Sequence, residues 1–122
     1  MKKLIFLLLL LPMLAACGQK LENADIAGSW ENEQAALYFG EDGSYEIKYS
    51  RFDVGGLSSE SGKYELGRGK VELKLRDKYT LNDLGEMDFR RLVRTENRKV
   101  DIELDEDTLV LDGEEYTRKE MY

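Results

Sequence analysis

The sequence predicts an all-β fold, an antiparallel up-and-down meander whose eight or nine strands close into a small barrel. Three observations predict it. Apolar and polar residues alternate along most of the chain after Gly28, short turn sequences separate the alternating runs, and no proline follows Pro12. A period of two is typical of strands with one buried face. A meander of this length usually closes, because closure removes exposed edges.

The predicted strands follow this alternation in chain order. In the clearest run, 70–76, Val71, Leu73 and Leu75 share one face, and the run 98–105 alternates in the same manner. The predicted strands are 28–32, 35–40, 44–53, 60–66, 69–76, 89–95, 98–105, 107–112 and 115–120.

Turn sequences rich in Gly and Asp lie between these runs, and each indicates a hairpin. They are Glu41-Asp42-Gly43, Gly67-Arg68-Gly69, Asp105-Glu106-Asp107 and Asp112-Gly113.

The stretch 77–88 breaks the alternation. Leu81, Leu84 and Met87 have partial helical spacing, but Gly85 disfavours a helix by about 1 kcal/mol. We expect a loop here with about one helical turn.

Residues 1–16 have the organisation of a secretory signal peptide. Lys2 and Lys3 precede an apolar run over 4–11, and small residues follow it. The run is too short to span a membrane, which requires about 20 residues. The chain has one cysteine, which excludes an internal disulfide, and no histidine, which removes the commonest general base and metal ligand.

The tetrad Leu14-Ala15-Ala16-Cys17 resembles the lipobox of bacterial lipoproteins. The resemblance implies cleavage before Cys17, a thioether-linked diacylglyceryl group on its thiol and acylation of the new amino group. Gly18 in place of Asp implies sorting to the outer membrane. Two or more acyl chains give stable anchoring, so we expect the membrane to be a partner through this lipid.

Cleavage divides the chain into a removed leader, 1–16, a lipidated cysteine with a flexible tether, 17–27, and a folded domain, 28–122. Loss of Lys2 and Lys3 changes the formal charge from −7 to about −9. This balance argues against binding nucleic acid, which requires a basic face. It also argues against a body that lies along anionic lipid.

Both ends of the domain resemble the small lipocalin-like domains of bacterial lipoproteins. Gly28-Ser29-Trp30 opens the first strand, and Thr108-Leu109-Val110-Leu111 with Tyr116-Thr117-Arg118 closes the chain. The resemblance implies a lipocalin-like barrel in which Trp30 plugs the closed end and Arg118 packs across its indole, a cation–π contact worth about 0.5–2 kcal/mol.

Tyr45, Tyr49 and Tyr64 are candidate ligand-lining residues, because a phenol combines apolar area with one polar group. An eight-stranded barrel either holds one small apolar or amphipathic ligand or is filled by its own side chains. The sequence favours a filled core.

Arg90, Arg91 and Arg94 form a candidate basic patch for an acidic envelope component. The alternative is pairing with acidic residues on a neighbouring strand, which we favour. The acidic run 101–107 suggests calcium, but its alternation better fits a solvent-exposed strand face, so we expect no metal.

No catalytic residue or cofactor is predicted, since the chain lacks histidine, a free thiol and a phosphate-binding loop. The sequence therefore predicts a non-enzymatic lipoprotein of the cell envelope. Two functions remain open, a binding protein for a small apolar ligand and a solid barrel that contacts another envelope protein.

Overall fold

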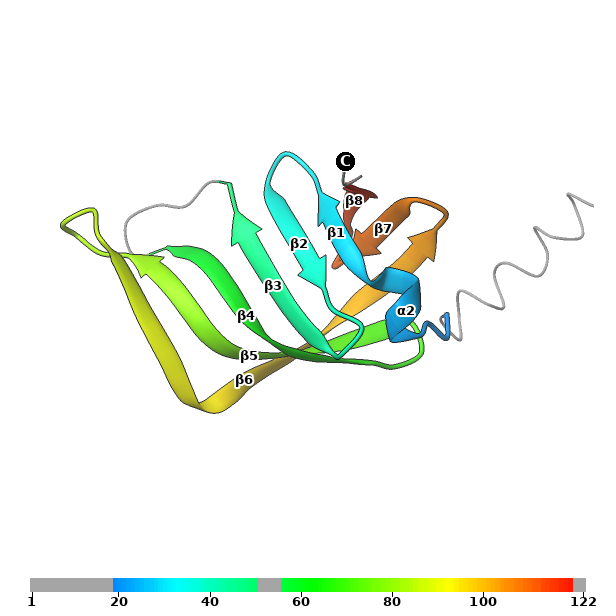
Figure 1. Ribbon diagram of the computed structural model, residues 1–122, viewed down its shortest axis with the longest axis horizontal. Coiled ribbons are helices and arrows are strands. Elements are labelled where there is room, and N and C mark those ends of the chain that lie inside the picture. The colour runs from blue at the N-terminus through cyan, green and yellow to red at the C-terminus, as the bar shows by residue number, and fades with distance from the viewer. Residues whose placement is uncertain (1–18, 51–55, 120–122) are drawn as a thin grey trace, which may run out of the picture.

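The protein forms a closed antiparallel barrel of eight strands in the order β1 to β8 (Figure 1). The computed structural model describes residues 19–50 and 56–119. The elements are α2 (Asn23–Ile26), β1 (Gly28–Glu31), β2 (Ala35–Phe39), β3 (Ser44–Tyr49), β4 (Leu57–Leu66), β5 (Lys70–Leu81), β6 (Met87–Asp105), β7 (Thr108–Leu111) and β8 (Glu114–Arg118).

Each strand pairs with its neighbour in sequence, and β1 pairs with β8 to close the barrel, with Trp30 opposite Arg118. The predicted all-β, lipocalin-like barrel is therefore confirmed. The predicted hairpin turns connect these strands. At the β7–β8 turn Asp112 and Gly113 both have positive φ, 52° and 82°, as a two-residue turn matched to the strand twist requires.

The three longest strands, β4, β5 and β6, are bent. The β4–β5 register shifts between Ser61 and Gly62, and the β5–β6 register shifts between Leu75 and Asp77. Such bulges let one strand turn a corner between two packed sheets. At Gly62 a Cβ would overlap the carbonyl oxygen of Lys74 on β5, so the close approach of these backbones requires glycine.

The core is filled by large side chains from the inward face of every strand. Trp30, Phe39, Ile102, Leu109 and Val71 are fully buried. The alternation that predicted the strands is the alternation of burial, as in β2, whose residues are buried and exposed in turn.

The expectation of a loop over 77–88 was wrong. β5 continues to Leu81, β6 begins at Met87, and a turn around Asn82 joins them; the Oδ1 atom of Asn82 accepts hydrogen bonds from the amides of Leu84 and Glu86. The predicted strands 89–95 and 98–105 are likewise one bent strand, β6. The pattern was obscured because this hairpin extends beyond the barrel and has no buried face.

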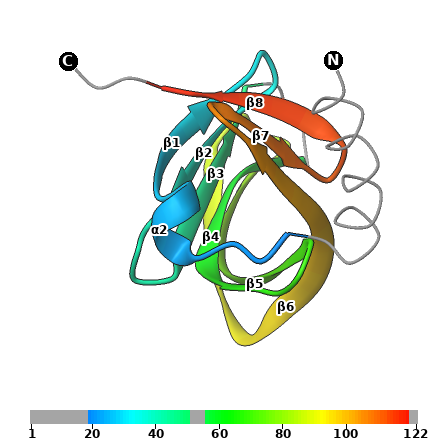
Figure 2. The same cartoon turned by 90° about the vertical axis from the view of Figure 1, so that its right-hand side faces the viewer.

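The flexible tether expected over 17–27 was also wrong for the described part of that segment. Ile26 is fully buried and Leu21 packs against the core, while Lys20 forms a bridge with Arg68. The backbone of this segment crosses the end of the barrel (Figure 2), and its apolar side chains Leu21 and Ile26 bind it to the core. The leader and Cys17 lie outside the described residues, as do residues 51–53 and 120 of two predicted strands.

Candidate functional site

The closed end of the barrel is built on Trp30. The indole is fully buried, and its Nε1 donates a hydrogen bond of 2.8 Å to the carbonyl of Ile26. The Arg118 guanidinium lies 4.2 Å from the centre of the Trp30 ring system. It also donates to the carbonyls of Ala27 and Asp25, at 2.8 and 3.2 Å. Arg118 therefore both hydrogen-bonds carbonyls at the C-terminal end of α2 and packs over the Trp30 indole.

The three predicted tyrosines point inward, and their hydroxyls bind groups of the protein itself. Tyr64 donates to the carbonyl of Gly40 at 2.7 Å. Tyr45 and Tyr49 both donate to the Glu60 carboxylate, at 2.9 and 2.6 Å. The polar groups proposed for a ligand are thus occupied within the barrel.

Glu60 is the centre of a buried polar cluster that joins β3, β4 and β6. Its side chain is fully buried, and Arg98 Nη2 donates to it at 2.7 Å from β6, completing a set of three donors with Tyr45 and Tyr49. Among the described residues no buried side-chain polar atom lacks a partner. A buried carboxylate is stable only when it is paired and hydrogen-bonded in this way.

The cluster shifts the titration of its members. Burial raises the pKa of both Tyr45 and Tyr49 above the ordinary tyrosine range, and the charge of Glu60 and its hydrogen bonds add to the effect. For Arg98, burial alone lowers the pKa, but the hydrogen bond and charge of Glu60 outweigh it and the pKa is raised. The phenols therefore stay neutral and the guanidinium charged at physiological pH.

Sequence reasoning missed the ion pair between Glu60, which is fully buried, and Arg98, whose side chain is 43% exposed, although the signal was present. Glu60 is in phase with Tyr64 on β4, and Arg98 is in phase with Val100 and Ile102 on β6. The signal is a charged residue that stands in the inward phase of its strand. Two charges of opposite sign in the inward phase of separate strands indicate an ion pair directed into the barrel.

The β5–β6 hairpin carries apolar side chains on its outer face. Tyr79 lies opposite Phe89 with ring centroids 5.1 Å apart, and Leu81 lies opposite Met87. We call these four residues the hairpin patch. Tyr79, Met87 and Phe89 are 43%, 50% and 53% exposed, and Leu84 at the turn is 82% exposed.

The predicted basic patch divides between two faces of this hairpin. Arg91 lies on the outer face, where its Nε donates to Asp77 at 2.8 Å, as the pairing alternative expected. Neighbouring strand residues point to opposite faces, so Arg90, which lies opposite Lys78, is on the inner side. Arg94 lies beside the bend of β6; all three are exposed.

One edge of β6 is free over much of its length. β7 pairs with β6 only from Ile102 to Asp105. Within residues 19–50 and 56–119 no strand pairs with that edge between Met87 and Val100. This segment holds five Lys or Arg against two Asp or Glu in a chain of net charge −7.

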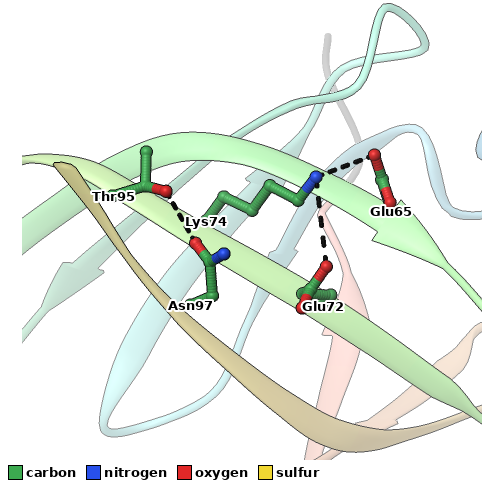
Figure 3. Close-up of polar contacts among 5 residues, drawn as sticks. All are labelled: Glu65, Glu72, Lys74, Thr95 and Asn97. Carbon is green, nitrogen blue, oxygen red and sulfur yellow. Dashed lines mark hydrogen bonds and ion pairs between the residues drawn. The ribbon is translucent and has the colours of Figure 1, made fainter.

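A hollow of about 560 Å³ lies on the outer surface of β2 to β6, with Tyr38, Lys63, Lys74 and Thr95 in its lining. Figure 3 shows that Lys74 turns toward Glu65 and Glu72, at 2.8 and 3.9 Å. Thr95 donates to Asn97 beside it. The charge of Lys74 is therefore already matched by carboxylates of the barrel.

No protein-family model matches the chain, and neither a curated protein nor a solved structure does. In the described part of the chain, no group of three or more Asp, Glu or Cys side chains is placed to hold a metal ion. The same residues contain no helix long and apolar enough to cross a membrane.

Proposed function

We propose that this protein is a non-enzymatic, lipid-anchored component of the bacterial cell envelope, held at the outer membrane through Cys17. Its barrel is a solid interaction module. The β5–β6 hairpin receives an acidic, extended segment of another envelope protein, which adds as a strand to the free edge of β6. The observation that carries this proposal is the exposed hairpin patch beside that edge.

The hairpin patch supports a docking role because none of its side chains belongs to the buried core. Large apolar residues grouped on one exposed face are typical of protein contacts. The pairs Tyr79–Phe89 and Leu81–Met87 form a continuous ladder, and Asn82 holds the turn in place. The surface is therefore preformed, which lowers the entropic cost of binding.

The free edge of β6 supports strand addition and favours an acidic partner. Unpaired backbone groups along an edge strand pair readily with an extended peptide. Charges on such an edge prevent indiscriminate pairing. Arg91 is already paired with Asp77. With Arg90 and Arg94 on this strand, a basic segment is repelled and an acidic segment gains attraction.

The filled interior favours this function over transport of a small ligand. Trp30, Phe39 and Tyr45 are fully buried in the core. The hydroxyls of Tyr45 and Tyr49 are directed to Glu60. A ligand would have to displace these contacts, whereas a partner on the hairpin displaces only water.

Site-specific photo-crosslinking in living cells tests the proposal. A photoreactive phenylalanine analogue at position 89 is expected to give one discrete protein adduct. The same analogue at Tyr38, an equally exposed aromatic on β2, serves as the matched control and is expected to give none.

The captured protein is then purified and its affinity measured. The double variant Tyr79→Ser/Phe89→Ser and the variant Arg90→Glu are each expected to weaken binding at least tenfold, which corresponds to about 1.4 kcal/mol. Equal adducts at positions 89 and 38, or unchanged affinity in both variants, would overturn the proposal.

A further inference from the structure

The chain that follows the predicted lipid site is bound to the barrel from its first described residue. The Gln19 side chain forms two hydrogen bonds with the backbone of Leu104 on β6; its Nε2 donates to the carbonyl at 2.9 Å, and its Oε1 accepts from the amide at 2.7 Å. The Gly69 amide donates to the carbonyl of Gln19 at 2.9 Å. Gln19 is thus held between the β4–β5 turn and the end of β6.

The next residues are held as firmly. Asn23 donates through Nδ2 to the carbonyl of Glu41 at 3.1 Å. The Ile26 side chain is fully buried, and its carbonyl accepts from Trp30. Arg118 donates to the carbonyl of Ala27. Figure 2 shows the segment from Gln19 to α2 crossing the end of the barrel.

Little free chain remains between Cys17 and this segment. Two residues span at most about 7 Å, so a lipid on Cys17 would lie within about that distance of Gln19. If residues 17–27 were a flexible tether, the barrel could lie several times farther from the lipid.

From this geometry we infer that the closed end of the barrel is a membrane-facing surface and that the protein stands upright on its lipid. The inference rests on the proposed acylation of Cys17. The surface consists of the 19–27 segment and the β4–β5 turn. Its charged residues are Lys20 and Arg68, which form a backbone bridge there, and Glu22 and Asp25. The surface therefore carries no net charge, unlike the acidic body as a whole, and anionic headgroups do not repel it.

The upright orientation determines where the hairpin patch lies. In Figure 1, α2 is at the right of the molecule and the β5–β6 turn is at the far left. The β5–β6 hairpin is therefore the part of the barrel farthest from the bilayer, and it extends away from the membrane surface. The partner's acidic segment must reach the outer end of the barrel.

Energy transfer from protein to lipid tests this orientation. The acylated protein, purified from membranes, is added to phosphatidylethanolamine–phosphatidylglycerol vesicles that carry a headgroup-labelled acceptor. A donor dye is placed on Arg68→Cys in one sample and on Asp83→Cys in another. Both residues are exposed, and Cys17 itself is blocked by lipid. Transfer is expected to be several-fold more efficient from position 68 than from position 83.

A matched variant removes the constraint. Ten Gly/Ser residues inserted between Gly18 and Gln19 form a random coil of roughly 18 Å, which frees the barrel to rotate, and the difference between the two positions should largely vanish. Equal transfer from both positions in the parent chain, with Cys17-dependent vesicle binding intact, would overturn the orientation alone. Binding that persists in Cys17→Ser would overturn the anchor as well.

Discussion

Glu60 illustrates how a single residue determines the interior of this barrel. Its carboxylate accepts from Tyr45, Tyr49 and Arg98, and removing it leaves two buried hydroxyls and a guanidinium without their acceptor. We expect Glu60→Ala to lower the free energy of unfolding by about 2–4 kcal/mol. Urea denaturation of the soluble domain measures this loss.

Glu65 on the same strand is the matched control. It also pairs with a cation, Lys74 at 2.8 Å, but its side chain is 68% exposed. Glu65→Ala should change stability by less than about 1 kcal/mol, as exposed pairs usually do. If both variants lost the same stability, the buried cluster would not be the stabilising feature described above.

The buried tyrosines predict a loss of stability in alkali. Burial raises the pKa of Tyr64 to about 12, and burial likewise raises the pKa values of Tyr45 and Tyr49. The unfolded chain loses its phenolic protons near pH 10. The stabilisation is therefore fully present below about pH 10 and is lost as the pH rises toward 12.

An ultraviolet titration of phenolate, recorded with circular dichroism, measures this effect. We expect part of the phenolate signal from the seven tyrosines to appear together with unfolding above pH 10. Complete ionisation near pH 10 with the barrel intact would contradict the buried placement of these hydroxyls.

At the scale of elements, the bend of β4 against β5 depends on Gly62. A methyl group there meets the carbonyl oxygen of Lys74, so Gly62→Ala should destabilise the domain by about 1–3 kcal/mol. Gly67→Ala is the control, because a Cβ there would lie 3.7 Å from the nearest backbone oxygen. Thermal unfolding of the two variants gives the comparison, and equal midpoints would contradict the role assigned to Gly62.

The elements differ in how well their sequences predicted them. β2, β5 up to Leu75 and the end of β6 alternate clearly, because one face of each strand meets the core and the other meets solvent. The β5–β6 hairpin has solvent on both faces, so Tyr79, Leu81 and Met87 follow no burial pattern. Its partial helical spacing therefore carried no information about packing against the core.

The candidate site, like the strands, was predicted from the sequence only in part. Trp30 and Arg118 were predicted from their resemblance to lipocalin-like ends, and the structure places them in contact. Glu60 was not predicted, because its partners Tyr49 and Arg98 are 11 and 38 residues away in sequence. Their proximity depends on which strands are brought together by the bends, and alternation alone does not specify that.

At the scale of the whole molecule, charge and shape are arranged along one axis. α2 lies at one end of the barrel, and the β5–β6 hairpin projects at the other (Figure 1). The proposed lipid site, Cys17, precedes the segment at the first of these ends. The net charge of −7 conceals a basic free edge on β6. In the proposed function, we expect an acidic body with one basic edge to raise the association rate for an acidic segment over that for other segments.

Native mass spectrometry of the protein, extracted in detergent from the cells that encode it, tests the central claim most directly. We predict a chain that begins at Cys17, carries acyl chains, holds no small molecule and associates with a protein partner that the Tyr79→Ser/Phe89→Ser variant no longer retains. A small apolar molecule retained by the chain in place of that partner, or a chain that still begins at Met1, would contradict it.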